Sequence, residues 1–102
     1  MRYLGRISGS GMLTCDGEQL ARASYDFDGY FRKPTGVTSC GEIRMPASIL
    51  KDVFWRHRVQ LLTDDGRVLD LRFTEKSLPS DSDVAHVDVT GGLPATPQYW
   101  RH

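Results

Sequence analysis

The chain has 102 residues, which fits one compact domain, and its 24 Leu, Ile, Val and Phe residues exclude a disordered chain. Thirteen basic side chains balance thirteen acidic ones, so nothing draws the protein strongly to nucleic acid or to an anionic membrane. No apolar run is long enough to span a bilayer. A signal peptide needs an unbroken apolar stretch, which Arg6, Ser8 and Ser10 interrupt, so we expect a cytoplasmic protein.

The first half of the chain alternates apolar and polar side chains with the period of a half-buried strand. The expected strands cover residues 2–14, 19–32 and 38–45. In the first of them Tyr3, Gly5 and Ile7 share one face, and the glycines of Gly9-Ser10-Gly11 predict a kink. The Asp16-Gly17 pair between the first two strands is a strong hairpin signal.

The period changes after Pro46, a residue well suited to a first helical turn. Ile49, Leu50, Val53 and Phe54 then fall at the spacing of one helix face. We therefore expect a short helix over residues 47–54, placed so that it could cap the open end of a barrel.

The second half of the chain contains the clearest hairpin. Two alternating segments, 58–63 and 67–74, flank Asp64-Asp65-Gly66, and a last strand covers 84–90. The predicted fold is all-β: a small antiparallel β-barrel or rolled sheet of about six strands with one short α-helix. Residues 1–93 would form this domain and residues 94–102 a C-terminal tail, docked on its own barrel or on a second copy.

The residues do not fit the common metal or cofactor motifs. Cys15 and Cys40 are far apart in the sequence, which suits free thiols, and no two histidines have the spacing of a zinc site. Gly9-Ser10-Gly11 starts like a dinucleotide-binding fingerprint, but no helix follows it. We therefore expect neither a metal nor a cofactor.

An enzyme is the less favoured interpretation, and the sequence leaves it open. Its catalytic residues would be Cys40, as a nucleophile, or His86, which lies beside Asp88 on one strand face. Neighbours on one face lie about 7 Å apart at the backbone, which does not by itself make a hydrogen bond. No catalytic residue is therefore assigned.

Arginines on the strand faces suggest a ligand site. Arg44, Arg72 and Arg22 could hold an anionic small molecule or a single strand of nucleic acid. Acidic residues share these faces, however, and cross-strand ion pairs explain such a pattern without a ligand. A receptor of this kind is the alternative hypothesis, with nucleic acid the less favoured ligand.

Aromatic side chains beside arginines suggest a protein interface, because Trp, Tyr and Arg are enriched at binding hot spots. The candidates are Trp55, after the predicted helix, and Tyr99 and Trp100, in the tail. Our first hypothesis is a non-enzymatic binding or adaptor protein that contacts a partner protein or a second copy of itself. Removal of residues 95–102 should then change the oligomeric mass or the partner binding.

Overall fold

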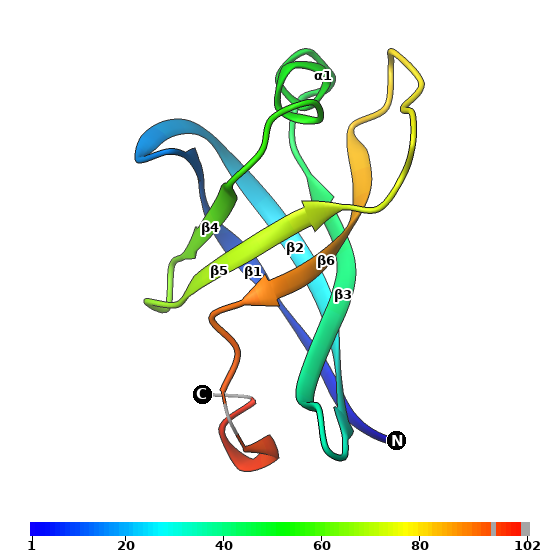
Figure 1. Cartoon of the computed structure of the whole chain (residues 1–102). Coiled ribbons are helices and arrows are strands. Elements are labelled where there is room, and N and C mark those ends of the chain that lie inside the picture. Colours follow the sequence, from blue (N-terminus) through cyan, green and yellow to red (C-terminus); the bar gives the residue numbers. More distant parts are fainter. Residues whose placement is uncertain (95, 101–102) are drawn as a thin grey trace.

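The alternating segments fold into a closed antiparallel barrel of six strands (Figure 1). The computed structural model describes residues 1–94 and 96–100. The strands are β1 (Arg2–Cys15), β2 (Glu18–Arg32), β3 (Gly36–Arg44), β4 (Val59–Thr63), β5 (Val68–Phe73) and β6 (Val84–Gly91). Their order around the barrel is β1-β2-β3-β6-β5-β4, and β4 pairs back onto β1. The predicted all-β architecture is confirmed, and the sheet closes.

Both predicted hairpin turns have the expected glycine geometry. Asp16 and Gly17 both have positive φ, 50° and 84°, as the two-residue turn between twisted strands requires. In the second hairpin the Gly66 N–H donates to the Thr63 carbonyl at 3.0 Å, and Gly66 takes φ 97°. That conformation strains any residue with a Cβ, so glycine is the residue that closes this turn.

The core consists of the inward side chains of all six strands. The most deeply buried of them are Leu13, Phe27, Ile43, Leu61, Leu69 and Val87. Burial of one such side chain stabilises the fold by about 1.5–3 kcal/mol. Ala85, Val87 and Val89 face inward on β6, as their alternation predicts.

The predicted helix forms and covers one end of the barrel (Figure 1). It is α1 (Ala47–Val53), begins after Pro46, and inserts Leu50 and Val53 into the core. No helix in the described residues is long and apolar enough to cross a membrane. The end that α1 covers is called the helix end below.

No β-bulge accompanies the predicted kink at Gly9-Ser10-Gly11, because β1 pairs with β2 without a register shift there. Gly11 allows two strands to pack closely. A Cβ added at Gly11 would lie 2.9 Å from the Cα atom of Thr63, where β4 closes the barrel. The glycine at position 11 therefore permits the close approach of β1 and β4.

The pairing of β1 with β2 is irregular near the start of β1 and again between Leu13 and Thr14. The register shifts between Tyr3 and Gly5, so Leu4 is an extra residue. An extra residue reverses the alternation of faces. Tyr3 is exposed and Gly5 is buried, so the prediction that they share one face is wrong.

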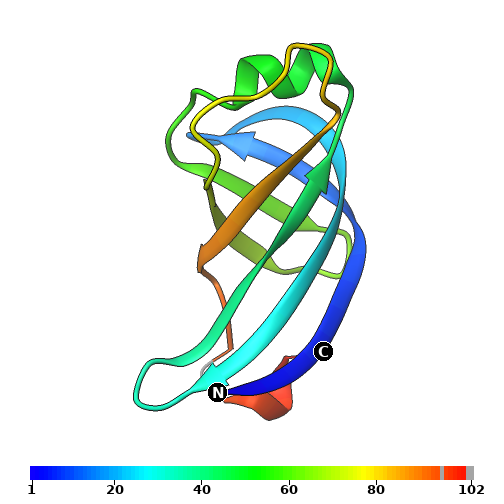
Figure 2. The same cartoon turned by 90° about the vertical axis from the view of Figure 1, so that its right-hand side faces the viewer.

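The chain after β6 returns to the end of the barrel opposite α1 (Figure 2). There η1 (Pro97–Tyr99), a single 3-10 turn, precedes Trp100, whose side chain is only 1% exposed. Its indole Nε1–H donates to the carbonyl oxygen of Gly5 at 3.1 Å. A Cβ added at Gly29 would lie 2.7 Å from Cδ2 of this indole. The tail thus docks on its own barrel, and Gly29 leaves room for the indole.

Candidate functional site

The helix end presents one tryptophan to solvent. Trp55 directly follows α1 and its side chain is 70% exposed, the most of any aromatic residue in the described part of the chain. The preceding Phe54 is only 7% exposed. Its ring lies 5.1 Å from the Trp55 ring, edge to face, and 5.3 Å from the ring of Phe73. The rings of Phe54 and Phe73 therefore form an aromatic base, and Trp55 packs against the Phe54 ring of this base at the surface.

Two hollows at the helix end share Phe54 and Trp55 in their linings. The larger has a volume of about 380 Å³ and also contacts segment 56–58, the end of β5 and residues 75–76. The smaller has a volume of about 130 Å³ and runs between Trp55 and Leu78-Pro79. They are called the basic groove and the small pocket below.

The basic groove is named for its lining. Four cationic side chains, those of Arg56, Arg58, Arg72 and Lys76, face a single carboxylate, that of Glu75. Glu75 is itself occupied, since its Oε1 accepts the backbone N–H of His86 at 2.7 Å. The wall of the groove therefore has an excess of positive charge.

The three arginines of the groove are paired with carboxylates outside its wall. Arg56 lies 3.0 Å from Asp52, Arg72 lies 3.0 Å from Asp88, and Arg58 lies 3.8 Å from Asp16. All three arginine side chains are more than a third exposed. Exposed ion pairs contribute only about 0–1 kcal/mol, so these arginines can exchange partners at small cost.

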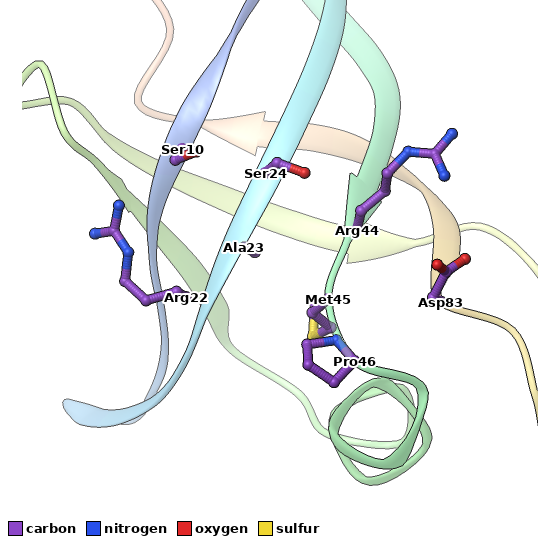
Figure 3. A pocket seen from close by; sticks show the side chains of 8 residues that line it. All are labelled: Ser10, Arg22, Ala23, Ser24, Arg44, Met45, Pro46 and Asp83. Carbon is purple, nitrogen blue, oxygen red and sulfur yellow. The ribbon is translucent and has the colours of Figure 1, made fainter.

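The three arginines predicted from the sequence do not form one site. Arg22 is held by Asp64 through two hydrogen bonds of 2.8 and 2.6 Å, which raise the pKa of Arg22 and lower that of Asp64. Arg44 makes no ion pair within residues 1–94 and 96–100. Both flank a shallow depression over Ser24 and point away from each other (Figure 3). Arg72 instead lines the basic groove.

The three predicted interface aromatics are also separated. Trp55 is exposed at the helix end, and Tyr99, in η1 at the other end, is 57% exposed. Trp100 fills the core of its own barrel, so its side chain is not part of the surface. The sequence missed this burial because the tail has no periodicity that separates inward from outward residues.

Among residues 1–94 and 96–100, neither Cys40 nor His86 has a partner that would activate it for catalysis. Cys40 lies in register between Asp28 and Asp88 on the neighbouring strands. Burial and these two carboxylates raise the pKa of the Cys40 thiol, which disfavours the nucleophilic thiolate. His86 faces the Thr74 hydroxyl at 3.1 Å, while Asp88 pairs with Arg72. His86 and Asp88 share a face, as expected, but are engaged elsewhere.

The groove itself was missed from the sequence because its walls come from two distant segments, 54–58 and 71–76. One signal was present, the run Phe54-Trp55-Arg56-His57-Arg58, in which an aromatic pair precedes cations. Nothing in the sequence places Lys76 opposite this run.

Among residues 1–94 and 96–100 no three His, Cys, Asp or Glu side chains are grouped so that they could hold a metal ion. Comparison of the chain with protein-family models, with curated proteins and with solved structures finds no match in any of the three.

Proposed function

We propose that this protein is a non-enzymatic binding module that engages a partner protein through Trp55 at the helix end of the barrel. The observation that carries the proposal is the exposure of Trp55, 70%, directly beside the buried Phe54. Apolar surface left in water costs roughly 25 cal/mol per Å², and a partner that covers it recovers that free energy. Tryptophan and arginine are the residues that dominate protein interfaces.

The small pocket beside Trp55 has the size of a single side chain, whereas the basic groove, at about 380 Å³, falls within the size range of small-ligand sites. Sites for small ligands usually have volumes of about 300–1,000 Å³. At about 130 Å³ the small pocket suits one side chain and not a whole ligand. Cations and one tryptophan beside it match the composition of protein hot spots.

A second candidate function is a receptor for an anionic small ligand or a single strand of nucleic acid. The four cations of the basic groove favour it. Such a receptor would lose affinity steeply as salt is added, because each phosphate contact releases counterions. Against it, Trp55 is the sole strongly exposed aromatic side chain lining the groove, whereas single-strand binding uses successive stacking surfaces.

The experiment compares three tagged proteins in co-purification from cells of the source organism: the wild type, Trp55→Ala and Tyr99→Ala. Tyr99→Ala is the matched control, because it removes an aromatic side chain of similar exposure at the opposite end. A partner that is recovered with the wild type and the control, and is lost with Trp55→Ala, supports the proposal. Sedimentation of the wild type and Trp55→Ala would detect a second copy as the partner.

Recovery that is equal with all three proteins would overturn the proposal. So would binding of fluorescein-labelled dT20 that disappears at high salt, together with the absence of a protein partner. Thermal unfolding of Trp55→Ala shows whether loss of binding reflects loss of the fold. Its exposure predicts an unchanged melting temperature, since surface substitutions usually alter stability by less than about 0.5 kcal/mol.

A further inference from the structure

The small pocket has walls that the fold holds in place. On one side Phe54 belongs to the buried aromatic base, and on the other Leu78 packs against the core. The loop beyond Leu78 is closed by a hydrogen bond from the Ser82 N–H to the Pro79 carbonyl at 3.1 Å. The Ser82 hydroxyl donates to the Val84 carbonyl at 2.7 Å. A pocket formed in advance spares a ligand the entropic cost of ordering it.

The chemistry of this pocket suits an apolar side chain. Phe54, Trp55, Leu78 and Pro79 supply carbon surface, and no carboxylate lines it. The Ser82 hydroxyl already has its hydrogen-bond acceptor, and Ser80, the other serine of the lining, is exposed to solvent. Lys51 stands at the rim as the one charged side chain in the lining.

The basic groove shares Phe54 and Trp55 with the small pocket, so the two hollows adjoin at these side chains. Alternate residues of an extended peptide lie about 7 Å apart, so one segment can place a side chain in each hollow. Lys76 makes no ion pair with the residues that the structure describes. A segment with carboxylates would meet Lys76 and the arginines, whereas a basic segment would meet like charge.

We infer that the partner presents an acidic peptide segment, which inserts one apolar side chain into the small pocket and lays its carboxylates in the basic groove. This inference rests on the proposed function and adds to it the chemistry of the partner. It predicts which peptides bind, independently of which protein carries them.

The test selects peptides from a random phage-displayed dodecapeptide library on the immobilised full chain, with counter-selection on Trp55→Ala. We expect the selected peptides to contain several Asp or Glu residues around one large apolar residue. Synthetic copies of the selected peptides are then titrated into the wild-type protein and its variants. Trp55→Ala should weaken binding by about tenfold or more, as for a hot-spot residue.

Two charge-reversal variants test the groove. Lys76→Glu removes a cation from its lining and should weaken binding by about tenfold. Lys33→Glu makes the same change in net charge in the β2–β3 turn, which lies at the other end of the barrel (Figure 1), and should leave binding unchanged. Equal effects of the two variants would overturn the electrostatic part of the inference.

Two further variants test the small pocket. Ser80→Phe places a ring at an exposed position in its lining and should block the apolar side chain. Ser8→Phe adds the same ring on the exposed part of β1 and is its control. A peptide that binds Ser80→Phe as well as the wild type does not use the pocket, and the inference fails.

The outcomes separate this inference from the proposed function. Basic or neutral peptides that still depend on Trp55 would overturn the acidic ligand and leave the binding module standing. Failure to select any Trp55-dependent peptide would overturn the inference, whatever the co-purification shows. If recovery of the co-purified partner also does not depend on Trp55, both the inference and the proposed function fail. Salt-sensitive binding of dT20 would then favour a nucleic-acid function.

Discussion

The contact between Gly29 and Trp100 makes a quantitative prediction about stability. Gly29 has no side chain, and a Cβ there would lie 2.7 Å from Cδ2 of the indole and closer still to Cε2 and Cζ2. The rigid ring cannot yield without leaving its place. We expect Gly29→Ala to lower the free energy of unfolding by about 1–3 kcal/mol, the usual cost of overpacking a core.

Removal of the indole should cost more. Trp100→Ala empties a buried site and leaves the Gly5 carbonyl without its donor, which predicts a loss of about 3–5 kcal/mol. A domain of this size has a total stability of about 5–15 kcal/mol, so this loss is a large fraction of it. In the double variant the new methyl group meets no ring. The double variant, Gly29→Ala with Trp100→Ala, should therefore be no less stable than Trp100→Ala alone. The coupling energy between the two substitutions should be about 1–3 kcal/mol.

Urea unfolding followed by far-ultraviolet circular dichroism measures all four proteins. With a slope of about 1–3 kcal/mol per molar urea, a loss of about 2 kcal/mol lowers the midpoint by about 1 M. Gly9→Ala is the control, because its Cβ would meet the Tyr25 hydroxyl at 3.1 Å and not the indole. If Gly29→Ala costs as much without Trp100 as with it, the contact does not determine that cost and the reasoning is refuted.

Three more predictions concern the rest of the barrel. The raised pKa of Cys40 predicts slow alkylation by iodoacetamide at pH 8 and a faster reaction in Asp88→Asn, read by peptide mass mapping; equal rates would refute it. The lowered pKa of Asp64 means that its pairing with Arg22 stabilises the fold above the unfolded pKa of about 3.9 and is lost as the pH falls through the folded pKa. Urea midpoints of the wild type and Arg22→Ala should therefore converge at low pH, and a constant gap would contradict this. Gly41→Ala puts a Cβ 2.8 Å from a Cα atom of β2, so thermal unfolding should show a loss of about 3 kcal/mol; an unchanged melting temperature would rule out that clash.

The elements that the sequence predicted correctly are those with local signals. The turn at Asp16-Gly17 and the one closed by Gly66 need positive φ within two or three residues, and the residue types show it. Alternation on β6 and helical spacing around Leu50 likewise report burial within one segment. These local signals sufficed for the fold class.

The features that it missed depend on contacts between distant segments. The bulge at Leu4 follows from how β1 pairs with β2, and no composition marks it. Trp100 is buried because Gly29 of β2 leaves space for its ring and the Gly5 carbonyl of β1 accepts its N–H. Arg22 meets Asp64 across 42 positions, and Trp55 and Lys76 line the same groove although 21 positions separate them. Such neighbours are set by barrel closure, which a single segment does not encode.

The positions of the two tryptophans have a practical consequence. The exposed indole of Trp55 follows the helix end, and the buried indole of Trp100 follows η1 at the other end. We expect an acrylamide quencher to reach the first and not the second, and their emission to differ because only the first is exposed to water. The protein thus contains a pair of optical reporters: a ligand at the helix end changes the emission of Trp55, while opening of the far end changes that of Trp100. One titration can therefore separate recognition from unfolding without an added dye.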